Sequence, residues 1–447
     1  MSESQRIIRS YYAIAALFTL SASIIWGVNT LFLLDAGLDL FGVFVANAGY
    51  SLGTFLFEIP TGVVADTLGR RTSFLLSVVV LGVVTLAYVG LAAVGAGLIP
   101  FALVSILLGL GFTFYSGAVD AWLVDALATT DHSGPLDPVF ARAGMFRGAS
   151  MILGTVGGGL LGQLDLALPF VVRSALLALL FVVAWGRMYD IGYVPRSLTR
   201  HNAIEEMVAT GRNGIRTALG TPDLRLVVVA GSVSSGFFIY AWYAWPPHFL
   251  ELFGDSGAVW VAGLVTAGMS VAMLLGNLLV ERVLGTVERR TTLIIWGFLM
   301  VAAGAFVVGT SDDFWVAVAA LLAMTLAWGL MTPVRTAYLH ASVPSAHRAT
   351  AVSTDSMVTG MTQVGGQVGL GALGRSRGEP AGYLVGSVVM VAALPLLLAV
   401  RRMGAIGDQI EEGGRIVVVD DAASTALLLS TDFPPDEAHG VKHRDDR

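Results

Sequence analysis

Twelve long apolar stretches follow one another along this 447-residue chain. They cover approximately residues 12–34, 41–65, 73–94, 98–126, 143–164, 168–188, 225–250, 258–280, 292–310, 313–339, 350–373 and 381–400. A helix needs about 20 apolar residues to cross the hydrocarbon core of a bilayer. Because lipid offers the backbone no hydrogen-bond partners, each stretch is predicted to be helical. The expected fold class is therefore all-α, a polytopic membrane protein with twelve transmembrane helices.

The composition excludes several other classes of protein. Hydrophobic residues make up 55% of the chain and charged residues 13%, whereas a soluble domain uses about 25% charged residues. The stretches lack the period-two alternation of a membrane β-barrel, and the first is too long for a cleavable signal peptide. With no cysteine in the sequence, disulfides and thiolate-bound metals are excluded. Neither a cofactor nor a nucleic-acid partner is indicated.

The arginines indicate an orientation. If the N-terminus is cytosolic, the outer loops contain Arg375 and Arg377, and the inside segments contain Arg6, Arg9, Arg70, Arg71, Arg142, Arg187, Arg196, Arg200, Arg212, Arg216, Arg282, Arg289, Arg290, Arg348, Arg401 and Arg402. Such an asymmetry follows the positive-inside pattern. We therefore expect a multi-pass protein of the inner or plasma membrane with both termini in the cytosol.

One polar stretch divides the spans into two sets of six. We predict a first half over 1–188, a cytosolic linker over 189–222 and a second half over 223–402. The remainder, 403–447, is rich in acids and contains Gly413-Gly414 and Pro434-Pro435. Its short apolar pieces cannot span a bilayer, so a disordered or loosely docked cytosolic tail is expected there.

The segment after the second span carries the most specific motif. Residues 58–71 read Glu-Ile-Pro-Thr-Gly-Val-Val-Ala-Asp-Thr-Leu-Gly-Arg-Arg. From Gly62 onward this is close to Gly-x-Leu-Ala-Asp-x-x-Gly-Arg-Lys, the signature of the major facilitator superfamily, with Val64 and Arg71 as departures. Together with the 6+6 organisation, the loop makes residues 10–402 resemble a transporter of that family, in particular its drug-efflux and permease-like members.

The resemblance implies a cytosolic latch between the two halves. In the family this loop contacts the second half near the start of span eleven, here around 347–355. The residues assigned to the latch are Gly62, Asp66, Gly69, Arg70, Arg71, Asp125, Arg142, Arg348 and Asp355. Gly62 is expected to permit close helix packing and Gly69 a tight turn. The alternative is a solvated turn whose arginines only set the topology.

An internal repeat supports the two-half design. Val156-Gly157-Gly158 recurs as Val364-Gly365-Gly366, 208 residues later, and a degraded copy of the loop motif occupies 276–290. Aligned on this repeat, the first half has an acid on span four and an arginine on span five, and the second half has the reverse. Since intramembrane charges usually pair, we expect the ion pairs Asp120–Arg147 and Arg335–Asp355.

Two carboxylates are candidates for proton coupling. Glu58, Gly62 and Asp66 are four residues apart, on one helix face, and Glu58 lies roughly 12 Å deeper than Asp66 by helical rise. Loss of water favours the neutral form of a carboxylate. Glu58 and Asp120, at a comparable depth, are therefore predicted to carry protons. The alternatives for Glu58 are a packing pair with Arg147 and direct substrate contact.

A substrate cavity is expected between spans one, four, seven and ten. The candidate lining residues are Trp26, Asn29, Tyr115, Phe238, Trp242, Trp245 and Trp328. Three of them form one stripe on span seven, just before Pro246-Pro247, which should break or kink that helix. Aromatics with few charges suit an apolar or cationic organic substrate. The alternative is an aromatic belt at the membrane interface.

These features predict a secondary active transporter that works as a monomer by alternating access. The favoured activity is proton-coupled export, an antiport of small apolar or cationic organic compounds. A metabolite symporter or facilitator, and a transporter-fold sensor that moves nothing, are the alternatives. An enzyme is not expected, because the sequence has no phosphate loop, no paired His/Glu metal motif and no nucleophile turn.

Overall fold

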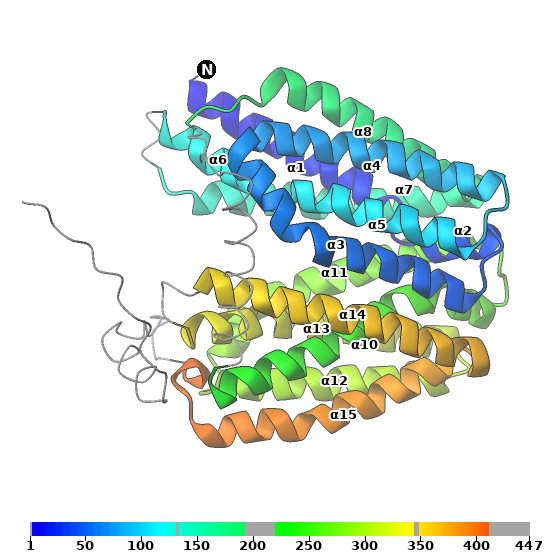
Figure 1. Cartoon of the computed structure of the whole chain (residues 1–447). Coiled ribbons are helices and arrows are strands. Elements are labelled where there is room, and N and C mark those ends of the chain that lie inside the picture. Colours follow the sequence, from blue (N-terminus) through cyan, green and yellow to red (C-terminus); the bar gives the residue numbers. More distant parts are fainter. Residues whose placement is uncertain (1, 131–133, 193–219, 344–347, 411–447) are drawn as a thin grey trace, which may run out of the picture.

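The computed structural model is a bundle of long helices (Figure 1). It describes residues 2–130, 134–192, 220–343 and 348–410, with only the backbone for 348–353 and 406. All structural statements below concern these residues. Most of the predicted linker (193–219) and of the predicted tail (411–447) lies outside them.

The helices form two groups that lie one above the other in Figure 1. The first bundle consists of α1 (Glu3–Ser23), α2 (Asn29–Asp35), α3 (Leu40–Leu68), α4 (Arg70–Ala93), α5 (Leu98–Tyr115), α6 (Ala118–Ala128), α7 (Asp137–Leu164) and α8 (Leu168–Arg187). The second consists of α10 (Pro222–Phe253), α11 (Val259–Leu284), α12 (Arg290–Thr310), α13 (Phe314–Ala341), α14 (Arg348–Arg377) and α15 (Glu379–Met403). The bundles meet where α3 packs on α14 and α7 on α11.

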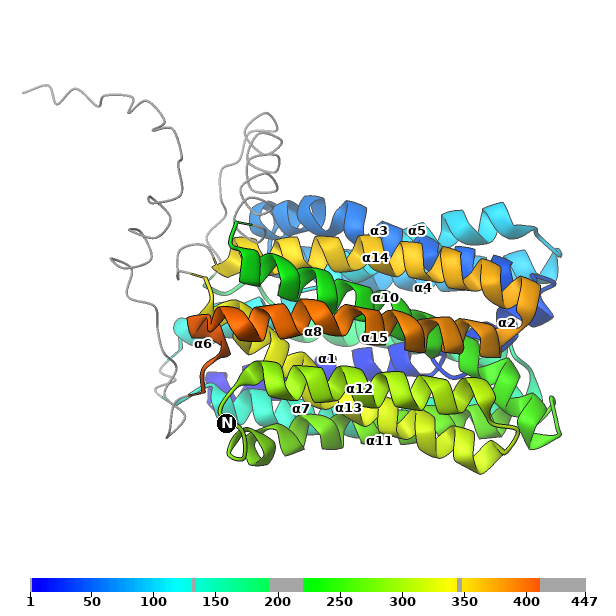
Figure 2. The same cartoon turned by 90° about the horizontal axis from the view of Figure 1, so that it is seen from below.

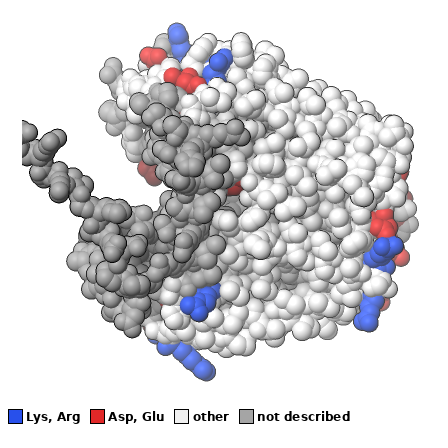
Figure 3. Space-filling model, viewed as in Figure 1, with Lys and Arg blue, Asp and Glu red and all other residues white. Residues whose placement is uncertain are grey.

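The lengths and composition of these helices fit a membrane. Within the described residues, nine segments are long and apolar enough to cross one: α3, α4, α5 with α6, α8, α10, α11, α12, α13 and α15. The more polar α1 with α2, α7 and α14 run beside them and complete the twelve predicted spans. Figure 3 shows charged side chains gathered at the two ends of the visible face, with a broad uncharged band between them.

Two predicted spans are broken. Span one is divided into α1 and α2, and span four into α5 and α6 at Ser116-Gly117, where Gly117 has a φ of 72° in the region that glycine adopts readily. The carbonyls at the end of α5 still find donors. Ser73 donates to Phe114 O (2.8 Å) and Ser77 to Gly111 O (2.6 Å). Two buried serines of α4 thus hold the end of α5 in place next to the break.

Helix α10 continues through Pro246 and Pro247, so of the predicted break or kink the break is absent. Pro247 has no N–H to donate to the carbonyl of Tyr243, four residues earlier. Thr30 of the first bundle donates to that carbonyl instead, at 2.8 Å. A side chain from the other bundle therefore satisfies the backbone group that the proline leaves free.

One end of the molecule carries the start of α1, the end of α8, the start of α10 and the end of α15, at the left in Figures 1 and 2. We call it the linker end. There the first residues of the predicted tail are ordered. The carboxylate of Asp408, 1% exposed, accepts from Thr291 N (2.7 Å) and Thr291 Oγ1 (2.9 Å) at the start of α12. Of the two expectations for the tail, residues 404–410 follow the docked one, because Asp408 is bonded to the start of α12.

At the opposite end the two bundles touch. Asp39 and Arg375 form an ion pair of 3.0 Å, and the rings of Phe44 and Tyr240 stack with centroids 4.9 Å apart. Gly159 and Gly263 approach so closely that a Cβ on Gly159 would lie 2.6 Å from the Cα of Gly263. These contacts join the bundles on the side away from the linker end.

Substitution Thr30→Val should lower the stability of the folded protein by about 1 kcal/mol, because Tyr243 O loses the hydrogen bond from the threonine hydroxyl. The matched control is Thr325→Val. Thr325 is equally buried, but its hydroxyl bonds to carbonyls of its own helix. Unfolding in detergent followed by circular dichroism measures both. Equal midpoints for the two variants would contradict the role given to Thr30.

Candidate functional site

A cavity of about 170 Å³ lies where the bundles meet, and most of the residues that border it belong to the first bundle. It is bordered by α1, α2, α3, α4, α5 and α8, and by Trp242 and Tyr243 from α10. Of the predicted substrate-binding residues, Trp26, Asn29 and Trp242 border it. Trp26 and Trp242 meet edge to face across the two bundles, with centroids 6.0 Å apart.

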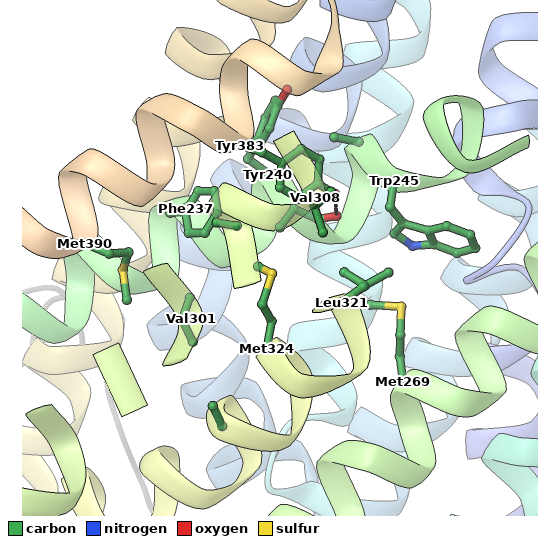
Figure 4. Close-up of a cluster of buried hydrophobic side chains, with 14 of the residues drawn as sticks. Phe237, Tyr240, Trp245, Met269, Val301, Val308, Leu321, Met324, Tyr383 and Met390 are labelled. Carbon is green, nitrogen blue, oxygen red and sulfur yellow. Dashed lines mark hydrogen bonds between the residues drawn. The ribbon is translucent and has the colours of Figure 1, made fainter. Parts of the chain in front are cut away.

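The other four predicted lining residues lie outside this border. Tyr115 stacks on Phe18, which does border the cavity, with centroids 3.6 Å apart. Phe238 stacks on Trp328 at 4.1 Å. Trp245, only 1% exposed, belongs to the core of the second bundle together with Met269 of α11 and Leu321 of α13 (Figure 4). At its level α10 is covered by its own bundle, so Trp245 is not available to the cavity.

Arg173 of α8 also borders the cavity, and the sequence analysis missed it. Its Nε is buried without a hydrogen-bond partner, and no described carboxylate forms an ion pair with it. Tyr50 and Tyr88 border the same cavity. One signal in the sequence was available. Arg173 lies well inside the apolar stretch 168–188, whose other arginine, Arg187, is at its end, and an intramembrane charge is by default a functional candidate.

Asp120 and Arg147 form the ion pair of the first bundle. Arg147 Nη2 lies 2.9 Å from Asp120 Oδ1, and the hydroxyl of Tyr11 donates to the same oxygen at 2.7 Å. Arg147 also donates to the Tyr11 hydroxyl at 3.2 Å. Asp120 lies in the first turn of α6, directly after the break in span four.

Glu58 has a different partner from the one the packing alternative gave it. Its Oε1 accepts a hydrogen bond from Ser116 Oγ at 3.1 Å, while Arg147 is bonded to Asp120. Ser116 is the residue at which span four breaks. The carboxylate is exposed in this conformation although α3 is a membrane-spanning helix. Glu58 is thus linked to the break, and no cation of the described segments pairs with it.

The second bundle has the corresponding pair with the charges exchanged. Arg335 of α13 binds Asp355 of α14 with both Nη1 and Nη2, the first at 3.0 Å, and each side chain is 13% exposed. A Cβ on Gly231 of α10 would overlap the guanidinium of Arg335. Asp355, predicted for the latch, is therefore bound within its own bundle.

The loop after α3 lies on the linker end of the first bundle. Arg70 pairs with Asp66 at 2.7 Å and approaches Asp125 of α6 at 3.7 Å. Gly69 has a φ of 100° and leaves no room for a Cβ beside the Asp190 carboxylate, so its predicted turn is present. Gly62, by contrast, has no atom within 4 Å of a Cβ position, so it is not needed here for close packing.

Arg71 faces away from the second bundle. Its backbone N–H donates to Asp190 Oδ1 at 2.9 Å, and its guanidinium donates to Trp185 O at 3.1 Å and lies 4.6 Å from the centroid of the Trp185 ring. Arg142 is exposed and bonds to no other described residue. The side chain of Arg348 lies outside the described residues.

The same capping arrangement occurs in both bundles. Asp190 follows α8 and accepts from the N–H of Arg71, the second residue of α4. Asp408 follows α15 and accepts from the N–H of Thr291, the second residue of α12. Each acid meets the positive end of a helix dipole. The second half therefore keeps this helix cap at Thr291, directly after the degraded loop copy, although the acid within that copy is displaced.

This arrangement of twelve spans in two related bundles defines a polytopic membrane transporter fold. The family model of the Major Facilitator Superfamily matches residues 11–265, more than half of the chain. The chain therefore belongs to the Major Facilitator Superfamily, a family of transporters and not of enzymes. No curated protein sequence matches it.

Solved structures give the same fold at low sequence identity. The nucleoside transporter NupG superposes with a TM-score of 0.71 and 11% identity, covering 89% of this chain and 99% of NupG. The POT family transporter PepTSo gives 0.66 and 13%, with 89% and 98% covered. The human organic anion transporter MFSD10 (TETRAN) gives 0.60 and 14%, with 89% and 100% covered. At these identities the likeness is one of fold.

Substitution Gly231→Ala should destabilise the second bundle by about 3 kcal/mol, because the added methyl group displaces Arg335 and leaves buried charges unpaired. Gly365→Ala in α14 is the matched control, since a Cβ there meets no atom within 4 Å. Thermal unfolding of the two purified variants provides the comparison. If Gly231→Ala is as stable as Gly365→Ala, the charge pair does not depend on this glycine.

Proposed function

We propose that this protein is a secondary active transporter that moves a small organic molecule by rocking its two bundles about the central cavity. The observation that carries the proposal is the position of the cavity. Trp26 and Asn29 border it from the first bundle and Trp242 and Tyr243 from the second. A change in the angle between the bundles would therefore change access to a bound molecule, as alternating access requires.

The orientation we propose puts the linker end in the cytosol, with the chain in the inner or plasma membrane. The excess of arginines in the segments at that end supports it. The Asp39–Arg375 pair and the Phe44–Tyr240 stack would then close the outer side. In this conformation substrate would enter from the cytosol, which is the direction that export requires.

For coupling, we assign the transported proton to Glu58. Protonating Asp120 would leave Arg147 without its counter-charge, whereas Glu58 has, among the described residues, only the Ser116 hydroxyl as partner and can bind a proton without that penalty. Ser116 stands at the break of span four and Asp120 begins the segment beyond it. A change in the charge of Glu58 would therefore act on the position of α6. We propose proton-driven antiport; symport of a metabolite is the alternative.

The substrate prediction divides into two parts. Trp26, Phe112 and Trp242 give the cavity an aromatic lining that suits the apolar part of an organic molecule. A cationic substrate, also predicted from the sequence, is disfavoured, because Arg173 borders the same cavity and like charges repel.

Substitution Glu58→Gln should abolish the effect of a pH gradient on transport but leave exchange at equal pH. The amide keeps the contact with Ser116 and stays neutral at every pH. The assay uses proteoliposomes with a pyranine dye inside and a substrate first identified by a thermal-shift screen. Wild-type flux should respond to the gradient at least tenfold more strongly than that of the variant.

The control is Glu251→Gln, an exposed acid at the far end of α10, which should behave as wild type. Asp120→Asn should slow exchange at equal pH as well, because it frees Arg147. A Glu58→Gln protein whose flux still follows the pH gradient would rule out the coupling assignment.

Substitution Asp66→Asn tests the proposed latch. Loss of the charge should weaken the hold on Arg70 and shift the protein toward an open linker end. Since the chain has no cysteine, spin labels can be placed at Ala128→Cys and Thr286→Cys, one on each bundle. The distance between the two labels is then measured by pulsed electron paramagnetic resonance. We expect a larger population at long distances in Asp66→Asn than in Asp137→Asn, which removes an exposed acid of α7. Identical distributions would exclude the latch.

A further inference from the structure

The charge of Arg173 has no counter-charge in the part of the chain that the structure describes. Arg173 lies in the spanning helix α8, five residues after its first residue, Leu168. Its Nε is completely buried and unbonded, and no carboxylate borders the cavity that it faces. An isolated arginine inside a membrane costs on the order of 3 kcal/mol even by insertion scales. A group of the opposite charge at this place would remove that cost.

The Arg173 side chain borders the internal cavity and is not a snorkelling arginine. A snorkelling arginine extends its guanidinium toward water or headgroups. Arg173 instead borders the cavity together with Tyr50, Tyr88 and Tyr243, which come from three other helices. The guanidinium is therefore one member of an internal polar group.

The rest of this polar group supplies hydrogen-bond donors. The hydroxyls of Tyr50 and Tyr243 bond to no other described residue, and that of Tyr88 shares a hydrogen bond of 2.6 Å with Ser105. Asn29 and Asn47 bond to each other at 2.9 Å. One permanent cation, two unengaged phenols and no competing carboxylate form an environment for an anion.

We propose that the cavity binds a small organic monocarboxylate, with Arg173 as its counter-ion. The planar guanidinium matches a carboxylate with two parallel hydrogen bonds, and a single cation compensates a single negative charge. The hydroxyls of Tyr50 and Tyr243 complete the contacts to the carboxylate oxygens. The edge-to-face pair Trp26–Trp242 receives the apolar part of the molecule, and the cavity volume of about 170 Å³ keeps it small. The inference names the substrate class of the proposed transporter and rests on that function.

The test compares three probes of one shape on the purified full-length protein. Benzoate, benzamide and benzylamine differ in charge and little in size. Isothermal titration and thermal shift at neutral pH should detect benzoate binding to the wild type and at least tenfold weaker binding of the other two. Sulfate and inorganic phosphate test for a site that takes any anion, and they should bind no better than benzamide.

Three variants locate the binding charge. Arg173→Gln should weaken benzoate binding at least tenfold. The affinity of Arg173→Lys should fall between those of Arg173→Gln and the wild type, because lysine keeps the charge but cannot donate two parallel hydrogen bonds from a planar group. Arg187→Gln removes the same charge from the exposed end of the same helix and should bind as the wild type does. Without ligand, Arg173→Gln should unfold at a temperature no lower than wild type, since it loses an unpaired charge.

Several results would overturn the inference. Equal stabilisation by benzamide or benzylamine, benzoate binding that survives Arg173→Gln, or a stronger effect of sulfate would each do so. So would the failure of a carboxylate panel from acetate to indole-3-acetate to bind the wild type. Binding needs neither a gradient nor flux. Arg173-dependent benzoate binding without any flux would therefore support the anion site and contradict the transport function. Flux of neutral compounds without benzoate binding would support the transport function and contradict the anion site.

Discussion

The absence of water in the hydrocarbon core is the constraint on which the rest of this structure depends. Every backbone group there must be bonded within the protein, and where a helix is interrupted a side chain takes over. Ser73 and Ser77 bond the last carbonyls of α5, and Thr30 bonds the carbonyl that Pro247 leaves free. These donors come from neighbouring helices, so at the end of α5 and before Pro247 the packing of the bundle supplies the hydrogen bonds. Phe112 and Tyr243, which lie close to these two places, border the cavity.

Charges follow the same constraint. Arg147 and Arg335 each have a carboxylate in their own bundle, and in the two bundles the acid and the base have exchanged helices. Pairing within a bundle lets each one move as a body without separating charges. Glu58 and Arg173 differ from this pattern, because the described chain gives neither a partner of opposite charge. A transport cycle can neutralise both from outside, the acid with a proton and the base with an anion.

The sequence alone was sufficient for the spans, the family and the two ion pairs, because apolar length, a contiguous motif and an internal repeat are local signals. It was insufficient where the local structure depends on a contact between residues that are distant in the sequence. The break at Gly117 depends on serines of α4, and continuity through Pro247 depends on Thr30. Trp245 shares a helix face with cavity residues but is covered by α11 and α13. Arg173 could have been predicted from the sequence, because a charged residue inside a membrane span is a functional candidate.

The caps on α4 and α12 have a consequence for biosynthesis. Asp190 is separated from Arg71 by 119 residues, and Asp408 from Thr291 by 117. The third span of each half therefore enters the membrane long before the residue that caps it has been synthesised. Each half can complete its hydrogen bonding only after its sixth helix has left the ribosome. The chain would mature in two steps of nearly equal length, with α4 and α12 open to quality-control proteins until each step ends.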